Sequence, residues 1–499
     1  MIRAGLFLLL LLLKFPGISL GSESPIADAA GREDWPRVES LIQQKADPNA
    51  AQKDGGTALH WAAYHDRVDV AQKLLAAGAK ASVANRYGVT PLSLACQNGN
   101  EELVGALLEA GADANAELHD GETALMTAAR TGKTGPVAKL LAKGANIEAK
   151  DRRGQTAIMR AAAEGHAEVI DVLVKAGADF RVRLRSGFTP LLFAAREGRI
   201  AAVRALLKAG TDPNDAIASN VKPGGREAPG GTSALIFAVE NGHFELAMEL
   251  VKAGANPNDQ RSGFTPLHTL SWVRKPNRGD DADGQPPPET TGKLTSLEFV
   301  RQLVAHGADI NAILSDRPRA AGKLGMAGAT PILLAAKTAD LPLMKLYVEL
   351  GAKPLLPNKD GSTPLMAAAG LGVYAPDEEA GTEEESLAAV EYLLTLGADV
   401  NTVDRNGETA MHGAAYKSLP KMVRLLADRG AKIEIWNRKN KSGWTPLLIA
   451  QGFRNGNFKP LAETIAAISE VMRAAGVEPP PAPERPVVPV KEEYKKPAP

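Results

Sequence analysis

The sequence predicts an all-α solenoid of about eleven helix-turn-helix repeats. Two series of residues predict this architecture independently of each other. Threonines recur every 33 residues and glycines recur at the same interval: Thr57, Thr90, Thr123, Thr156 and Thr189; Gly78, Gly111, Gly144, Gly177 and Gly210. A fixed period of about 20 to 50 residues indicates a repeat architecture. Neither helix of such a unit buries its apolar face alone, so each repeat must pack on its neighbours.

Each repeat reads as two short helices with a defined start and end. The threonine, or Ser233 in one copy, is the N-cap of helix one, and its oxygen accepts a first-turn N–H. Prolines follow it at the first helical position, where a missing N–H is harmless: Pro91, Pro190, Pro266, Pro331, Pro364 and Pro446. A second apolar stripe, such as VAQKLL at 70–75, predicts helix two. The glycine after it supplies the left-handed residue that ends the helix.

The repeated segments resemble those of a known family. GGTALHWAA at 55–63, GVTPLSLAC at 88–96, GETALMTAA at 121–129 and GFTPLLFAA at 187–195 are successive copies, and later copies start at Ser233, Thr265, Thr330, Thr363, Thr409 and Thr445. The chain therefore resembles the ankyrin repeat family over residues 24–476, and in particular exported bacterial ankyrin-repeat proteins. The resemblance implies β-hairpin fingers between repeats and protein binding on the concave face that the fingers and the inner helices form.

Both ends of the chain differ from the repeats. Residues 1–21 have a basic start, an apolar run of about eight residues and a small-residue site, which is typical of a signal peptide cleaved before Ser22. We therefore expect an extracytoplasmic protein, periplasmic or secreted, with no transmembrane segment after cleavage; an uncleaved anchor or retention in the cytoplasm is the alternative. Residues 24–50 are predicted to be an N-terminal capping half repeat, 51–476 the solenoid, and 477–499 a disordered tail rich in proline and lysine.

Four insertions interrupt the period after Gly210, near residues 215–230, 273–294, 313–328 and 370–385. All are rich in glycine, proline and charge, so we expect loops. The first and third fall in fingers, whereas the second and fourth fall between helix one and helix two. The last insertion carries six acidic residues and no basic residue. The loops are either tolerated solvated additions, because lengthening a loop costs little, or determinants of partner choice.

Composition and motifs argue against catalysis. The 58 basic residues balance the 58 acidic ones, so no global field favours nucleic acid. A single cysteine, Cys96, excludes an intramolecular disulfide and a cysteine-based zinc site, and we expect it to be a buried, inert thiol.

The GKT triplet at 132–134 lacks the first glycine of a phosphate-binding loop, because Thr127 stands there. Five histidines occupy repeat positions and are expected to be structural. We therefore predict a protein that is not an enzyme and has no cofactor and no metal site; Asp280, Asp281 and Asp283 form only a weak calcium candidate.

The candidate protein-binding residues are those that the resemblance places at finger tips and at the exposed ends of the first helices. They are Tyr64, His65, Arg86, Tyr87, His119, Arg130, Arg152, Arg153, Arg185, Phe188, Arg196, Arg261, Phe264 and Trp272. Tyrosine, tryptophan and arginine often anchor protein interfaces. Trp61, Phe193, Phe237 and Leu334 are expected in the core instead. We predict a non-catalytic scaffold for a protein partner; binding of a carbohydrate or another cell-envelope ligand on the aromatic stripe is the alternative. Changing Tyr64, Tyr87 and Phe188 together to alanine should abolish capture with little loss of stability.

Overall fold

The computed structural model describes residues 24–218, 229–277, 286–315, 324–373, 376, 379–455 and 459–483. Within these residues it contains 25 helices and no β-strand. They form two compact units, unit 1 from residues 1–185 and 201–210 and unit 2 from 186–200 and 211–499. The predicted signal peptide and the tail from residue 484 lie outside the described residues, as do parts of all four insertions and the three aspartates of the calcium candidate.

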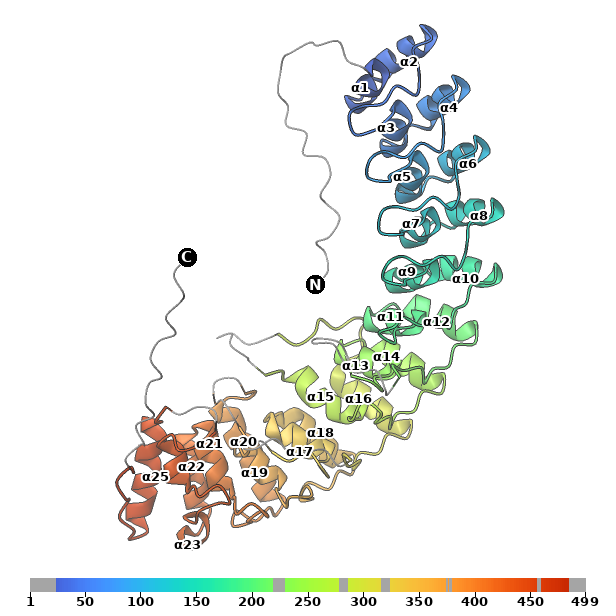
Figure 1. Ribbon diagram of the computed structural model, residues 1–499. Helices are drawn as coiled ribbons and strands as arrows, with labels where there is room; N and C mark the ends of the chain where they lie inside the picture. The colour runs from blue at the N-terminus through green and yellow to red at the C-terminus, as the bar shows by residue number, and fades with distance from the viewer. Residues whose placement is uncertain are drawn as a thin grey trace, which may run out of the picture. The chain divides into compact units, whose positions relative to one another are not determined.

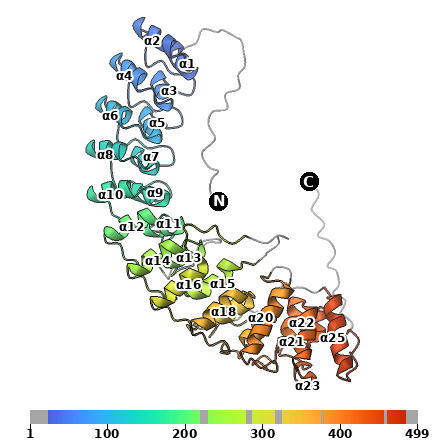
Figure 2. The same cartoon turned by 180° about the vertical axis from the view of Figure 1, so that it is seen from behind.

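Unit 1 consists of helix pairs stacked in register. The pairs are α1 (Pro25–Gly31) with α2 (Trp35–Gln43), α3 (Ala58–Tyr64) with α4 (Val68–Ala76), α5 (Pro91–Asn98) with α6 (Glu101–Glu109), α7 (Ala124–Thr131) with α8 (Thr134–Ala142) and α9 (Ala157–Glu164) with α10 (Ala167–Lys175). Most of α12 (Ile200–Lys208) also belongs here. First helices form one column and second helices a parallel one (Figures 1 and 2). The segment 24–50, predicted as a half repeat, contains a complete pair of helices.

Unit 2 continues the same alternation with longer connections. It contains α11 (Pro190–Arg196), α13 (Ala234–Glu240), α14 (Phe244–Lys252), α15 (Pro266–Arg274), α16 (Ser296–Ala305), α17 (Pro331–Lys337), α18 (Leu341–Glu349), α19 (Pro364–Ala368), α20 (Glu383–Thr395), α21 (Ala410–Lys417), α22 (Pro420–Asp428), α23 (Ile433–Trp436), α24 (Pro446–Ala450) and α25 (Ala462–Ala474). The extra short helix α23 was not predicted, and it buries Trp436 between two repeats of the pattern.

The predicted helix starts are confirmed in most repeats. The hydroxyl accepts the N–H of the third helical residue at Thr90, Thr123, Thr189, Ser233, Thr265, Thr330, Thr363 and Thr445. In α3 and α21 the threonine hydroxyl instead meets the Nδ1 of the histidine three residues on, at 2.9 Å for Thr57 and 3.0 Å for Thr409. The expectation is wrong for Thr156, whose buried hydroxyl has no hydrogen-bond partner. The five predicted glycines all have positive φ, between +82° and +96°.

Apolar side chains between the two helix columns hold each unit together. In unit 1, Leu59, Leu74, Leu92 and Leu103 are fully or almost fully buried. In unit 2, the rings of Phe244 and Phe299 stack with centroids 5.1 Å apart. Each fully buried side chain of this size contributes about 2 kcal/mol relative to an exposed one. Because no disulfide is present among the described residues, packing of this kind carries the stability of the units.

Six asparagines staple the turn after one second helix to the turn after the next. In each case the side-chain amide donates to the carbonyl of a helix-ending glycine, and its oxygen accepts a backbone N–H two residues later: Asn49, Asn115, Asn214, Asn258, Asn311 and Asn401. The asparagine thus satisfies a carbonyl that the helix end leaves open. This device sets the register of consecutive repeats in addition to apolar packing.

Candidate binding surface

The fingers are tight turns that hydrogen-bond to one another along each unit. A backbone N–H near the tip of one finger donates to a carbonyl of the preceding finger at 2.7–2.9 Å: Arg86 to Asp54, Arg152 to Asp120, Lys359 to Ala327, Arg405 to Asp360 and Lys441 to Asn406. Among the described residues only two isolated β-bridges occur, Glu117 with Thr123 and Ala216 with Ser233. The predicted β-hairpin fingers are therefore hairpin-like turns without regular strands, because each arm is too short for a ladder.

In unit 1 the structure places the predicted binding residues at the surface. Tyr64 is 47% exposed and Tyr87 is 41% exposed, which makes them the largest exposed aromatic side chains of the described chain. Five further predicted residues are exposed on fingers: Arg86, His119, Arg152, Arg153 and Arg185. His119 also braces its neighbour, because its Nε2 lies 3.0 Å from the carbonyl oxygen of Arg86. Arg130 is half-buried, and its guanidinium lies 3.8 Å from Glu122.

An aromatic cluster at the end of α3 extends this surface. His65 lies 4.9 Å from Tyr64 and 5.6 Å from Trp35 between ring centroids, and it stacks on Trp61 at 6.0 Å. The Arg67 guanidinium lies over the Trp35 ring at 5.0 Å. Trp61, which was predicted in the core, is only half-buried. Sequence reasoning missed Trp35, since it lies in the atypical first helix pair and follows no repeat position.

The prediction that Phe188 is an exposed binding residue is wrong. Its side chain is only 9% exposed, and its ring packs against Phe193 at 5.1 Å and Phe237 at 5.2 Å. The Arg196 guanidinium covers the Phe188 ring at 4.9 Å and pairs with Glu197 at 2.8 Å. A phenylalanine at the base of a finger reaches the apolar positions of two adjacent first helices, so burial outweighs exposure here. Phe188 belongs to the core together with Phe193 and Phe237, which were predicted there.

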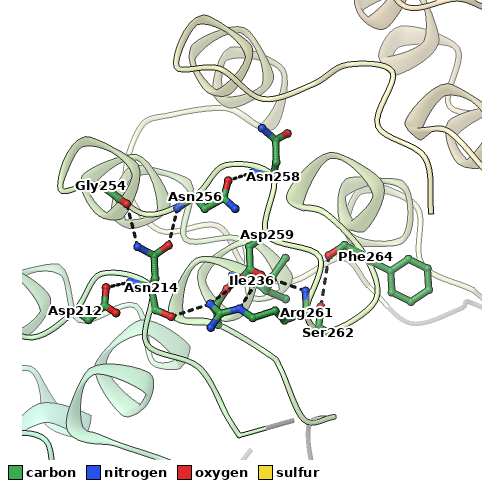
Figure 3. A network of polar contacts seen from close by, with 11 residues as sticks. Asp212, Asn214, Ile236, Gly254, Asn256, Asn258, Asp259, Arg261, Ser262 and Phe264 are labelled. Atoms are coloured by element: carbon green, nitrogen blue, oxygen red, sulfur yellow. Dashed lines mark hydrogen bonds and ion pairs between the residues drawn. The ribbon is translucent and has the colours of Figure 1, made fainter. Parts of the chain in front are cut away.

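A polar cavity of about 420 Å³ lies beside the next finger of unit 2. Asn214, Asn256, Asp259, Gln260 and Arg261 line it. The Arg261 guanidinium binds Asp259 at 2.9 Å and donates to the carbonyl of Asn214 at 2.7 Å. The hydrogen bond to Asp259 raises the pKa of Arg261. Figure 3 shows Asn214 bridging Gly254 and Asn256 as part of the asparagine staple. The polar groups of this cavity are thus largely committed to one another.

Phe264 and Trp272 form a separate aromatic pair. Their ring centroids are 4.8 Å apart in an edge-to-face arrangement, and both side chains are half-buried. Phe264 points away from the polar network around Arg261 (Figure 3). The two rings therefore brace each other at the base of α15 and present edges rather than one continuous open platform.

The acidic insertion near 370–385 folds over first-helix ends of unit 2. Glu379 pairs with Lys337 at 2.7 Å and Glu385 pairs with Lys275 at 2.5 Å. Lys417 is 5% exposed, and its ammonium donates to the carbonyl of Ala380 at 2.8 Å and to the Ser386 hydroxyl at 3.1 Å. Burial, reinforced by the charge of Lys337, lowers the pKa of Lys417 to about 8. The insertion therefore contacts the last residues of α17 and α21.

The insertion near 273–294 covers another first-helix end. The Thr291 hydroxyl lies 3.0 Å from Nδ1 of His243, and the N–H of Lys293 donates to Glu245 at 2.6 Å. Pro288 and Thr290 lie against Gly242. At the end of α21, Tyr416 is 3% exposed and donates its hydroxyl to Glu408 at 3.0 Å. In unit 1 the 33-residue period is unbroken from Thr57 to Thr156, so the repeats of this unit carry no insertion of their own.

The histidines serve the structure, as predicted from their repeat positions. His60 and His268 each join the N-cap threonine to a carbonyl of the next finger, at 3.1 Å from Val89 and Ala329 respectively. His166 and His243 bond the carbonyls of Arg130 and Arg196. In the described part of the chain no group of three or more histidine, cysteine or acidic side chains could hold a metal ion. Cys96 is buried, as predicted, and burial raises the pKa of its thiol to about 12.

Stacked helix pairs joined by projecting turns define a protein of the helical-repeat class. Models of ankyrin repeats match residues 26–118, 125–217 and 380–465, more than half of the chain, and a single-repeat model matches 230–261. The chain belongs to the ankyrin repeat family. Ankyrin repeats generally mediate protein–protein interaction, and proteins of this family are typically non-enzymatic. Across the described residues, none of the helices is both long enough and apolar enough to cross a bilayer.

Several proteins are similar over part of the chain. Human SH3 and multiple ankyrin repeat domains protein 2 is 29% identical over 212 residues, which cover 38% of this chain and 10% of that protein. Neurogenic locus notch homolog protein 1 of Danio rerio is 36% identical over 208 residues, 38% of this chain and 8% of that protein. The crystal structure of the human ASB11 ankyrin repeat domain matches with 25% identity, 47% coverage of this chain, 99% of that domain and a TM-score of 0.40. The chain thus spans only a small part of these two curated relatives.

Proposed function

We propose that this protein is a non-catalytic scaffold that binds a protein partner on the fingers and first-helix ends of unit 1. The observation that carries the proposal is the contrast between the two units. In unit 1, Tyr64 and Tyr87 are exposed beside arginine-bearing fingers, and the repeats of this unit carry no insertion. In unit 2, Phe188 and Tyr416 are buried, and two insertions lie on the first-helix ends. Exposed aromatic and arginine side chains are favoured anchors at protein interfaces.

Capture from extracytoplasmic extract tests the proposal. We expect the immobilised chain to retain one or a few proteins and a Tyr64→Ala/Tyr87→Ala variant to lose them. Both hydroxyphenyl groups are exposed, so this variant should keep its thermal stability. A matched control removes exposed apolar side chains from unit 2, Leu355→Ala and Val403→Ala, which are 44% and 49% exposed. Equal capture by both variants and the parent contradicts the proposed surface.

The alternative ligand is a carbohydrate or another cell-envelope component. Sugar binding uses open aromatic faces on which rings stack, but Phe188 is buried and Phe264 packs edge-to-face on Trp272. These contacts favour the protein-binding proposal. If the chain retains isolated envelope polymer and captures no protein, the envelope-ligand alternative replaces the protein-binding proposal.

Export remains part of the proposal. The apolar run within residues 1–21 supports an extracytoplasmic location. Determination of the N-terminus of the protein recovered from cells tests it: a start at Ser22 in the extracytoplasmic fraction is expected, and an intact Met1 in the cytoplasmic fraction contradicts it.

A further inference from the structure

Two consecutive fingers of unit 1 carry a concentration of positively charged side chains. The finger at 150–155 exposes Lys150, Arg152 and Arg153, and the next finger exposes Arg185. We call these four residues the arginine patch. None of their side chains makes a hydrogen bond or an ion pair within the part of the chain that the structure describes. Arg183, in the same finger as Arg185, has contacts of its own and is left out of the patch.

The acidic residue within these fingers is already neutralised. Asp151 is 7% exposed, and its carboxylate pairs with Arg160 at 2.8 Å. The same carboxylate accepts the N–H groups of Arg153 and Gln155, each at 2.8 Å. Because this charge is buried and paired, it does not screen the four exposed cations. Among 58 basic and 58 acidic residues in the whole chain, the patch is therefore a local excess of positive charge.

The backbone that presents the patch is held on both sides. The N–H of Arg152 donates to the carbonyl of Asp120 in the preceding finger at 2.9 Å. On the other side, the Leu184 side chain packs on Gly154, where an added Cβ would lie 3.4 Å from Leu184 Cδ2. The guanidinium groups thus project from a pre-organised backbone, which lowers the entropy lost on binding.

The spacing of the patch suits an extended chain with regularly placed carboxylates. Arg152 and Arg185 occupy equivalent positions one repeat apart. Stacked helices lie about 8–10 Å from axis to axis, so equivalent finger residues are about 10 Å apart. A peptide in the polyproline II conformation rises about 3.1 Å per residue with three residues per turn, so carboxylates three residues apart lie on one face, about 9 Å apart, and meet equivalent arginines. Guanidinium groups bind carboxylates in a planar, two-pronged geometry.

We propose that the arginine patch docks an acidic, extended segment of the protein partner in the polyproline II conformation, with aspartate or glutamate at about every third residue. The inference rests on the proposed function and adds the chemistry of the partner to it. A peptide fits better than nucleic acid, since nucleic-acid-binding domains combine a strongly basic pI with a long basic stripe. The chain here has a pI near 7.1 and the patch covers two fingers.

Fluorescence polarisation with defined peptides tests the inference on the full chain. The probe is a labelled peptide of about 12 residues with glutamate at every third position, and its matched control carries glutamine instead. Arg152→Gln/Arg153→Gln/Arg185→Gln removes three patch cations, whereas Lys139→Gln/Lys143→Gln/Lys175→Gln removes the same charge from α8, its C-cap and α10 of the same repeats. Unfolding curves check that both variants fold.

The inference expects saturable binding of the glutamate peptide to the parent and to the lysine variant. Binding to the arginine variant should be about tenfold weaker, the factor that several exposed ion pairs can supply together. Affinity should also fall between about 50 and 300 mM NaCl because exposed pairs are screened. No saturable binding, equal loss in both variants, or tighter binding of duplex DNA overturns the inference. If the tyrosine variant loses partner capture while the arginine variant retains it, the proposed function stands and this inference fails.

Discussion

Two buried histidines predict how unit 2 responds to acid. His268 and His412 are fully buried in α15 and α21, where each ring meets the threonine that begins its helix. Burial lowers the pKa of both imidazoles to about 4. Lowering the pH from 7.5 to 5 therefore leaves the folded rings neutral, whereas an unfolded histidine, with a pKa of about 6.5, becomes protonated.

The sign and the size of the effect follow from proton linkage. Below pH 6.5 the unfolded chain binds more protons than the folded chain, so the free energy of unfolding falls as pH falls toward 4. Each histidine contributes about 1.4 kcal/mol per pH unit in this window. Between pH 6.5 and 5 the loss is about 2 kcal/mol per histidine, or about 4 kcal/mol for the two. Burial raises the pKa of Asp259, but hydrogen bonds, led by the one from Arg261, lower it further, so the pKa lies below its ordinary value. The stability that the ionised Asp259 contributes is therefore lost only at lower pH.

Urea unfolding followed by tryptophan fluorescence measures this loss. The control variant is His268→Leu/His412→Leu, because Leu192, Leu333 and Leu448 occupy the same position in other repeats of this chain. The variant loses the hydrogen bonds to the threonines, so its stability at pH 7.5 is lower, but its decrease on going to pH 5 should be about 4 kcal/mol smaller than that of the parent. An equal decrease in the two proteins refutes the argument.

Three further predictions concern single positions. Asn258→Ala removes hydrogen bonds to the carbonyl of Gly307 at 2.8 Å and from the N–H of Asp309 at 2.7 Å, so denaturant unfolding should show a loss of about 1–2 kcal/mol. Gly132→Ala should destabilise the protein by at least about 1 kcal/mol more than Gly144→Ala. Both glycines have positive φ, but only a Cβ added at Gly132 would meet the His166 ring, at 2.6 Å. Equal shifts in the melting temperature contradict this. The pKa of Lys417 is lowered to about 8, so the folded chain releases this proton at a lower pH than the unfolded chain does. The free energy of unfolding should therefore rise by about 1.4 kcal/mol per pH unit between about pH 8 and 10. Lys417→Met should remove this rise.

The helical framework could be predicted from the sequence because its signals are local. A threonine, a proline at the first helical position and a glycine after the second helix each act within one turn of the chain, and the structure confirms them in nearly every repeat. Thr156 shows the limit of such signals: alanine follows it, as alanine follows Thr123, yet the Thr123 hydroxyl caps its helix and the Thr156 hydroxyl makes no hydrogen bond. The asparagine staples depend on a partner one repeat away, so the period alone did not reveal them.

Exposure at the candidate surface depended on contacts that no repeat pattern encodes. Tyr64, Tyr87 and Phe188 looked equivalent, because each lies at a finger or at the end of a first helix. Phe188 alone has two phenylalanine rings within reach, from Phe193 and Phe237, and is buried by them. The predicted triple alanine variant would therefore lose core packing, by about 3–5 kcal/mol at Phe188 alone, and the tyrosine pair is the variant that separates binding from stability.

The acidic insertion shows why composition alone does not locate a binding face. Six acidic residues in one insertion suggest a solvated segment or a site for a basic partner. In the structure, Glu379 pairs with Lys337 of α17, and Glu385 pairs with Lys275 at the end of α15. The backbone carbonyl of Ala380 accepts a hydrogen bond from the Lys417 ammonium of α21. These lysines come from three different repeats, so the pairing becomes apparent only after the repeats are stacked. The insertion thus neutralises basic first-helix ends of unit 2, whereas the arginines of the two unit 1 fingers keep their charge available for a partner.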